Sequence, residues 1–87
     1  MAATYEIEFT ASAARSFRKL DETTRRRIAL KIDSLGVDPR PRGAVKLSGS
    51  DNIFRIRLRD YRILYSIEDQ KLIVLVVAIG HRRDVYR

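Results

Sequence analysis

Apolar and polar residues alternate in two separate parts of the chain. Near the N-terminus, Tyr5, Ile7 and Phe9 alternate with glutamates, which predicts a half-buried strand. From residue 52 the period is again two, and apolar side chains at every second position predict two further strands. A two-residue turn at Arg59-Asp60 joins them as a hairpin and places their apolar residues on one face. Those residues are Phe54, Ile56, Leu58, Tyr61, Ile63 and Tyr65.

Between these regions, apolar positions at helical spacing predict two helices. Thr10 or Ser12 is the predicted N-cap of the first helix, which extends to Leu20. Asp21 is the predicted N-cap of the second, and Gly36 is its predicted C′ residue. The apolar stripe comprises Ala13, Phe17, Leu20, Ile28, Ile32 and Leu35, and Arg25, Arg26 and Arg27 lie off it and are expected to face solvent.

The remaining segments complete one small domain. Residues 37–49 contain both prolines and two of the four glycines, so we expect a loop. Residues 68–71 are a predicted turn, and residues 72–79 are apolar on both faces, as in an interior strand. The predicted fold is α+β: a β-α-α-β-β-β order with a helical hairpin packed on one face of a mostly antiparallel four-stranded sheet. Residues 1–87 are expected to form this single domain.

Composition excludes several classes of protein. The chain has 87 residues and no cysteine, so disulfide frameworks and thiolate metal sites are excluded. His81 is the sole histidine, and nothing in the sequence indicates a metal site or a cofactor. The longest apolar run, residues 72–79, is far shorter than the ~20 residues of a membrane span, and the first residues do not resemble a signal peptide. We therefore expect a soluble, cytoplasmic protein.

The basic charge is concentrated in the middle of the chain. The formal net charge is +7, and residues 40–65 carry seven basic and two acidic side chains. The chain has 14 arginines and 4 lysines, and the planar arginine side chain suits bidentate phosphate contacts and stacking on bases. This surplus favours a polyanion or an acidic protein as the partner, although a basic surface that only aids solubility remains an alternative.

The hairpin register gives this charge a defined surface. It places Arg57 directly opposite Arg62 on the face away from the apolar residues, with Arg55 and Arg59 beside them. Like charges directly opposite destabilise a sheet, so the pattern indicates that an anion normally binds there. The alternative is that these side chains spread into water or pair with acidic residues. The candidate acidic partners are Glu6, Glu8 and Asp84.

The C-terminal segment supplies a second group of functional side chains. Histidine is the side chain best suited to proton transfer near neutral pH, so His81 is a candidate for that role as well as an ordinary structural residue. Tyr86 is suited to stacking on an unpaired base, or to closing the edge of the core. Arg82 and Arg83 lie between them and add two more guanidinium groups.

These motifs, in this order, resemble the RelE/ParE superfamily of toxins from toxin–antitoxin modules. The resemblance covers nearly the whole chain: the Phe/Tyr strand, two helices, the Lys46-Leu47-x-Gly49 loop, the arginine-rich hairpin and the Gly-x-Arg…Tyr ending. It implies either the RelE activity, metal-free cleavage of messenger RNA in the ribosomal A site, or the ParE activity, inhibition of DNA gyrase. The Arg82…Tyr86 ending and the basic hairpin favour RelE.

The resemblance also implies residue roles. Arg62 and Arg82 would stabilise the charge that develops on the scissile phosphate, and Tyr86 would stack on or orient the target nucleotide. Arg55 and Arg57 occupy two basic positions where lysines can stand in the family. The residues expected to bind RNA around this centre are Lys46, Arg59, His81 and Arg83.

An arginine pair changes the chemistry expected of a RelE-like site. Attack of the 2′-hydroxyl on the adjacent phosphate would leave a 2′,3′-cyclic phosphate and a 5′-hydroxyl, and it needs a general base. Arginine effectively cannot lose its proton, so Arg55 and Arg57 would only supply positive charge. The candidate bases are Tyr86, His81 and Asp84.

The leading hypothesis is therefore a ribosome-dependent endoribonuclease toxin. A cognate antitoxin with an acidic or amphipathic segment would cover the basic region and form a hetero-oligomer with it. Two alternatives belong to other classes: a gyrase inhibitor that performs no chemistry, and a basic RNA- or ribosome-binding module that neutralises phosphates without cutting RNA.

Overall fold

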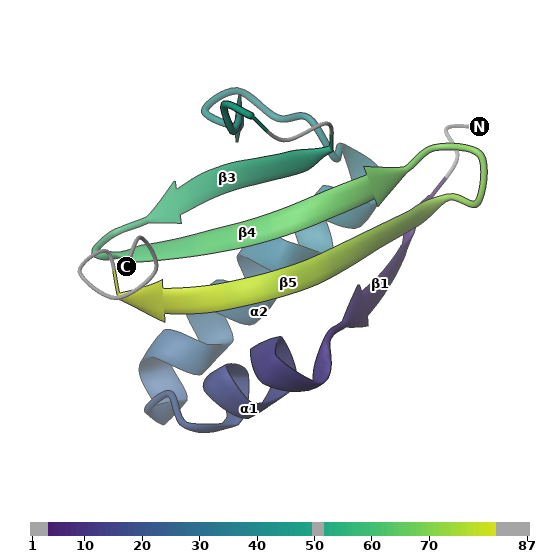
Figure 1. The fold of residues 1–87 in the computed structure, drawn as a ribbon. Helices are drawn as coiled ribbons and strands as arrows, with labels where there is room; N and C mark the ends of the chain where they lie inside the picture. The colour runs from purple at the N-terminus through teal and green to yellow at the C-terminus, as the bar shows by residue number, and fades with distance from the viewer. Residues whose placement is uncertain (1–3, 50–51, 82–87) are drawn as a thin grey trace.

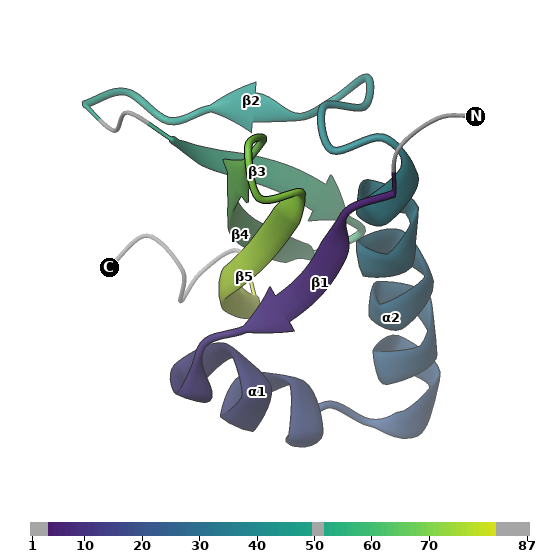
Figure 2. The same cartoon turned by 90° about the vertical axis from the view of Figure 1, so that its right-hand side faces the viewer.

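A computed structural model describes residues 4–49 and 52–81. In this part of the chain, two helices cover one face of a five-stranded sheet (Figure 1, Figure 2). The elements are β1 (Glu6–Phe9), α1 (Ala11–Arg18), α2 (Glu22–Val37), β2 (Val45–Lys46), β3 (Ile53–Leu58), β4 (Tyr61–Glu68) and β5 (Ile73–His81). The strand order is β1-β5-β4-β3-β2, and only the β1–β5 pair is parallel. The predicted α+β class and helical hairpin are confirmed.

The prediction of four strands was wrong, because β2 adds a fifth. It lies in the segment predicted as a loop and pairs antiparallel with the outer edge of β3, Val45 with Arg55 and Lys46 with Phe54. Two residues are too few to show an alternating pattern, and the flanking prolines and glycines dominate the local signal.

The β3–β4 hairpin has the predicted register. Leu58 pairs with Tyr61 across the turn, and Arg57 pairs with Arg62. The apolar face packs under the helices, where Ile56, Ile63 and Tyr65 are among the most buried side chains. The period-two pattern therefore identified both the turn and the buried face.

Strand β5 is the interior strand of the sheet, as predicted, but its bounds differ. It begins at Ile73, one residue later than expected, because Leu72 belongs to the preceding turn and has a φ of 55°. Glu68 belongs to β4 rather than to the turn. A register shift opposite Leu64/Tyr65 leaves Val77 as an extra residue in β5, since Val76 pairs with Tyr65 and Ala78 with Leu64.

The first helix has the expected start and an earlier end. Thr10 is its N-cap, because the Thr10 hydroxyl oxygen accepts a hydrogen bond from the Ala13 amide at 3.1 Å. The helix ends at Arg18 rather than at the predicted Leu20. The N-cap of α2 is Asp21, as predicted, and its carboxylate accepts from the Thr24 amide at 3.2 Å.

The assignment of Gly36 as a C′ residue was wrong. The helix continues to Val37, and Gly36 is buried where β1 crosses its last turn. The Tyr5 amide donates a hydrogen bond to the Gly36 carbonyl oxygen at 2.7 Å, and a Cβ at Gly36 would lie 3.0 Å from the Tyr5 carbonyl oxygen. A glycine here thus permits close contact between strand and helix.

We expect Gly36→Val to destabilise the fold by about 1–3 kcal/mol, because the branched side chain overpacks the contact with Tyr5 and Ile7. Thermal denaturation followed by circular dichroism measures this effect. Ser34→Val is the control, since Ser34 is exposed in the same helix and carries the same cost of β-branching. Equal melting temperatures for the two variants would show that the close contact is not needed.

The core lies between the helices and the sheet. The fully or nearly buried apolar residues are Ala13, Ile28, Ile32, Leu35, Ile56, Ile63, Tyr65, Ile67, Val74, Val76 and Ile79. The Tyr65 hydroxyl donates to the Pro39 carbonyl oxygen at 2.8 Å, and burial raises the pKa of Tyr65 to about 12. That hydrogen bond fixes the loop after α2 to the core. No helix in the described ranges has the length and apolarity that crossing a membrane requires.

Hydrogen bonds among three polar side chains connect the start of β1 and the loop after α2 to the β4–β5 turn. Arg40 makes two hydrogen bonds to the Asp69 carboxylate, at 2.8 and 3.2 Å, and the Tyr5 hydroxyl donates to it at 2.6 Å. The Arg40 guanidinium also lies over the Phe54 ring, 5.6 Å from its centroid. The hydrogen bonds from Arg40 and then Tyr5 hold the pKa of Asp69 at about 2, below its ordinary value.

This cluster predicts a loss of stability in acid. Because the folded-state pKa of Asp69 lies below its unfolded value of about 3.9, its contribution is present above that value and is lost as the pH falls toward 2. We expect Asp69→Asn to be less stable than the wild type in urea at neutral pH, with the difference disappearing near pH 2. Asp60→Asn, in a turn outside the cluster, is the control. A difference between wild type and Asp69→Asn that does not vary with pH would contradict the ionic role of Asp69.

Candidate nucleic-acid interface

The face of the sheet that the helices leave open carries the arginine cluster. Arg57 and Arg62 are directly paired across β3 and β4, and Arg55 lies two residues before Arg57 on the same face. Arg57 is exposed, whereas Arg55 and Arg62 are half-buried with their Nε atoms shielded from solvent. The strands fix the positions of Arg55 and Arg62 on this face, and each side chain is partly covered by its neighbours.

The bulge in β5 shapes the space next to this cluster. Because Val77 is an extra residue, Gly80 pairs with Arg62 on the open face and His81 pairs with Tyr61 on the helix side. Gly80 has no side chain, so no β5 side chain stands directly beside Arg62 on the open face. Without the bulge, the alternation along β5 would reverse these two positions.

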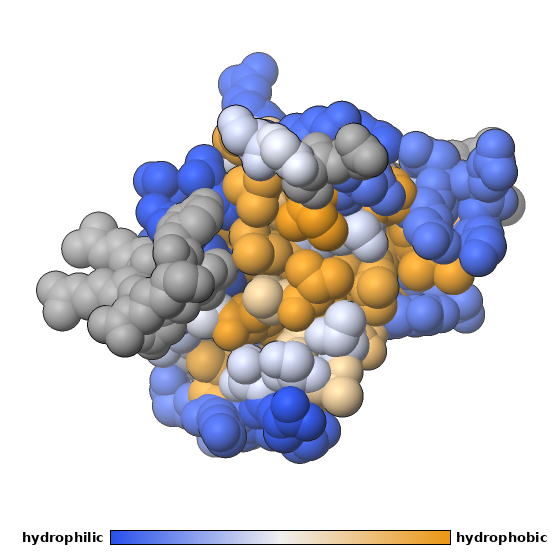
Figure 3. All heavy atoms as spheres, in the orientation of Figure 1, coloured by the Kyte–Doolittle hydropathy of each residue, from blue (hydrophilic) through white to orange (hydrophobic). Residues whose placement is uncertain are grey.

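An apolar surface adjoins the arginine cluster on the open face. Figure 3 shows it at the centre of the face, surrounded by polar residues. The strand register assigns it Val45, Ile53, Leu64, Ile73, Leu75 and Ala78, of which Val45 is 45% exposed and the others are half-buried. A surface with cationic and apolar parts suits nucleic-acid backbone and bases, and equally an amphipathic peptide.

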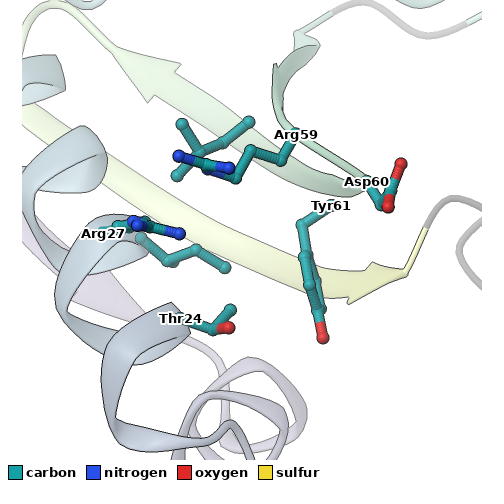
Figure 4. Close-up of a pocket in the computed structure, with 7 residues that line it drawn as sticks. Thr24, Arg27, Arg59, Asp60 and Tyr61 are labelled. Carbon is teal, nitrogen blue, oxygen red and sulfur yellow. The ribbon is translucent and has the colours of Figure 1, made fainter.

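The three described residues expected to bind RNA around the cluster, Lys46, Arg59 and His81, lie on the helix side of the sheet and not on the open face. Arg59 forms the tip of the hairpin with a φ of 56°, and its side chain extends toward the helix side (Figure 4). The His81 ring packs edge-on against Tyr61, with 5.7 Å between centroids. Lys46 is exposed on the edge strand and pairs with Phe54, whose ring is on the helix side. The structure thus brings Arg55, Arg57 and Arg62 together on the open face. Lys46, Arg59 and His81 do not belong to that cluster.

Four expected functional residues lie outside the described part of the chain. They are Arg82, Arg83, Asp84 and Tyr86. Arg82 follows directly after His81, the last described residue of β5, in the sequence.

Sequence reasoning missed a second group of residues on the helix side. Arg27 is exposed, as expected, and it also lines a small cavity together with Arg59 and Tyr61. Arg25 is partly buried and donates to the Leu20 carbonyl oxygen at 3.2 Å. The available signal was that Arg27 directly precedes Ile28, a residue of the apolar stripe, near the start of the second helix. In the structure this part of α2 lies opposite the hairpin tip.

The chemistry available to the open face is electrostatic. Guanidinium groups at fixed positions can stabilise negative charge that develops on a phosphate, but they do not accept protons at neutral pH. Among residues 4–49 and 52–81, no three His, Cys, Asp or Glu side chains are grouped as metal ligands.

Comparison with known proteins places the fold and sequence in one group of toxins. The family model described as "ParE toxin of type II toxin-antitoxin system, parDE" matches residues 7–86. The mRNA interferase toxin RelE of Escherichia coli is 34% identical over 86 residues, covering 94% of this chain and 90% of RelE. Toxin RelG of Mycobacterium tuberculosis is 29% identical, with 95% of this chain and 97% of RelG covered.

Solved structures agree with these matches. The toxin–antitoxin complex RelBE2 of Mycobacterium tuberculosis gives a TM-score of 0.83 at 27% identity, covering 97% of this chain and 98% of that one. The intact Escherichia coli RelBE complex gives 0.79 at 32% identity, covering 88% and 95%. Because the family model and these relatives match along nearly the whole length, this chain belongs to the RelE/ParE family of toxins from type II toxin–antitoxin systems.

Proposed function

We propose that this toxin cleaves messenger RNA in the A site of the translating ribosome. The observation that carries the proposal is the Arg57–Arg62 pair, held by the strand register on the open face of the sheet. Two guanidinium groups fixed so close together favour an anionic ligand. The name of the Escherichia coli relative, an mRNA interferase, supports RNA as that ligand.

The proposed reaction is an internal transfer of the phosphate. The 2′-oxygen of one nucleotide attacks its neighbouring phosphorus, and the bond from phosphorus to the 5′-oxygen of the next nucleotide breaks. The products are a 2′,3′-cyclic phosphate and a 5′-hydroxyl, so the 2′-hydroxyl loses a proton and the 5′-oxygen gains one. In this scheme Arg62 and Arg82 stabilise the phosphate charge, Arg55 and Arg57 add to the positive field, and Tyr86 orients the nucleotide.

The general base must be a residue other than the arginines. Of the candidates, His81 packs against Tyr61 on the helix side, away from Arg57 and Arg62. The proposal therefore favours Tyr86 or Asp84, which follow Arg82 in the chain. The base must reach within hydrogen-bond distance of the 2′-hydroxyl in the bound complex.

The remaining basic residues would bind RNA away from the scissile phosphate. Lys46 lies on the edge strand, Arg59 at the hairpin tip and His81 at the end of β5, all apart from the arginine cluster, and Arg83 follows Arg82 in the sequence. Their contribution would be neutralisation of phosphates on the message or on ribosomal RNA, which makes binding weaker at higher salt.

We infer that a cognate antitoxin binds the same open face. The relatives in the RelBE2 and RelBE structures are solved as toxin–antitoxin complexes. Here the apolar residues Leu64 and Leu75 adjoin the arginine cluster, which matches an amphipathic, acidic segment. Its binding would exclude RNA and give a hetero-oligomer in the cytoplasm, where ribosomes are located.

Primer extension on a message in a purified translation system tests the proposed activity. The wild type and Arg82→Ala are compared with and without ribosomes. We expect cuts at A-site codons with the wild type only when ribosomes are present, and loss of these cuts in Arg82→Ala. Ribosome binding that falls steeply with salt, without any cut, would instead indicate a non-catalytic RNA-binding module.

A second candidate function is inhibition of DNA gyrase, because the matching family model is named for ParE toxins. This function requires binding to the enzyme and no chemistry by the toxin. It predicts inhibition of DNA supercoiling by purified gyrase and induction of the DNA-damage response in cells, while messages stay intact. Cut messages with normal supercoiling would exclude it.

A further inference from the structure

A small cavity lies on the helix side of the β3–β4 hairpin tip, separate from the open face. Its volume is about 120 Å³, and the first turns of α2 form one wall while the hairpin forms the other (Figure 4). Ile28 is fully buried at its base, and Leu58 and the Tyr61 ring complete an apolar surface. The cavity is well below the 300–1,000 Å³ typical of small-molecule sites, which suits one apolar side chain.

Two cationic side chains border this apolar cavity. Arg27 from α2 and Arg59 from the hairpin tip both extend over it, whereas the Asp60 carboxylate points away (Figure 4). Within the described part of the chain, neither Arg27 nor Arg59 forms an ion pair. Two guanidinium groups from different elements at the edge of one cavity favour a ligand with negative charge.

The hairpin turn positions one of these two side chains. Arg59 is the first residue of the two-residue turn and has a φ of 56°, as such turns require, although glycine or asparagine adopts this conformation with less strain. Its guanidinium extends over the cavity (Figure 4).

We propose that this cavity docks a leucine-like side chain of an acidic peptide partner, with the neighbouring carboxylates of that peptide bound by Arg27 and Arg59. An apolar anchor in a pocket with charged contacts at its rim is the usual form of a strong peptide contact. A nucleic-acid base is less suitable, because the cavity is smaller than a typical small-molecule site and much of its wall is apolar, from Ile28 and Leu58.

The partner that fits the proposed function is the antitoxin. In naming that partner, the docking proposal rests on the proposed function. The cavity is on the opposite side of the sheet from Arg57 and Arg62. An antitoxin segment bound here would hold the toxin without occupying the RNA face, while another segment covers that face. Affinity for the antitoxin and cleavage of RNA should therefore be separable by mutation.

Nuclear magnetic resonance titration of the full chain tests the site directly. The probe is the peptide acetyl-Glu-Glu-Leu-Glu-Glu-amide, with acetyl-Glu-Glu-Ala-Glu-Glu-amide as the matched control. We expect the leucine peptide to shift the side-chain signals of Arg27, Arg59 and Tyr61, and to bind more tightly than the alanine peptide. Arg27→Ala should weaken binding about tenfold, whereas Arg26→Ala, in the same helix but outside the cavity, should not.

A second variant separates binding from folding. Arg59→Gly removes the guanidinium and relieves the backbone strain, so we expect a melting temperature no lower than that of the wild type together with weakened peptide binding. Identical binding by wild type, Arg27→Ala and Arg59→Gly would overturn the proposal. Shifts at the cavity with a uridine hexamer but not with the peptide would also overturn it, in favour of nucleic acid.

Arg27→Ala also distinguishes the docking proposal from the proposed function. We expect Arg27→Ala to cleave messages in the ribosome assay at the wild-type rate, because Arg27 is remote from the arginine face. If the wild type cleaves no message, the proposed function fails while the titration still decides the docking site. If the wild type cleaves and the peptide shows no binding, only the docking site fails.

Discussion

Arg62→Ala is expected to lower the rate of ribosome-dependent cleavage by about two to three orders of magnitude. A positioned charge donor to a transition-state oxyanion is commonly worth this much. Arg62 is half-buried in β4 and pairs with Gly80 of β5, so the sheet fixes its position on the open face. Arg57, which is exposed, should contribute less when replaced in the same way.

Single-turnover cleavage on programmed ribosomes measures the chemical step separately from binding. Arg62→Lys keeps the charge but not the planar pair of donors, and we expect an intermediate rate. Arg26→Ala is the control for loss of an exposed arginine, since Arg26 pairs with Glu22 on the outer side of α2. A wild-type rate for Arg62→Ala would remove Arg62 from the proposed site.

Stability distinguishes a functional role of Arg62 from a structural one. The Arg57–Arg62 pair places like charges directly opposite each other, which destabilises a sheet. We therefore expect Arg62→Ala to remain folded, with a denaturation midpoint close to that of the wild type. The lost charge repulsion and the lost packing of the arginine stem act in opposite directions.

The hairpin could be predicted from the sequence because several signals agreed on it. Period-two alternation on both sides of Arg59-Asp60 left a single register that places the alternating apolar residues, from Phe54 to Tyr65, on one face, and the structure has that register. The placement of Arg55, Arg57 and Arg62 on one face follows from it. The alternation of apolar and basic residues was therefore sufficient to predict the arginine face of the candidate site.

Other features depend on contacts that no local pattern records. Gly36 looks like a helix terminator, yet it is retained within the helix because β1 crosses there and its backbone bonds to the Gly36 carbonyl. Strand β2 exists because the edge of β3 is available for pairing, and its own two residues carry almost no signal. Both are cases in which tertiary packing overrides local propensity.

The position of His81 shows how one residue can change a functional assignment. A regular strand through residues 73–81 would alternate without interruption, and the extra residue Val77 reverses the faces of everything after it. That bulge directs Ile79 into the core and His81 toward Tyr61. A run that is apolar on both faces contains no signal for such a shift, so the sequence could not exclude His81 from the arginine face.

The second large effect is expected from combining Arg62→Ala with Arg82→Ala. Each single variant should lose about 10²–10³-fold in cleavage rate if its guanidinium stabilises the scissile phosphate. If both act on the same phosphate, the double variant should lose less than the product of the two single losses, because residues that act as a unit are not additive. We expect a loss of about 10³–10⁴-fold.

Losses that multiply fully would mean that the two arginines act at separate points, for example one on the scissile phosphate and the other in binding the message. Arg27→Ala combined with Arg62→Ala is the matched control cycle, since Arg27 is on the helix side and should leave the loss due to Arg62 unchanged. If the Arg62/Arg82 cycle is non-additive while the Arg27/Arg62 cycle is additive, Arg62 and Arg82 act on the same phosphate. The proposed phosphate transfer requires that arrangement.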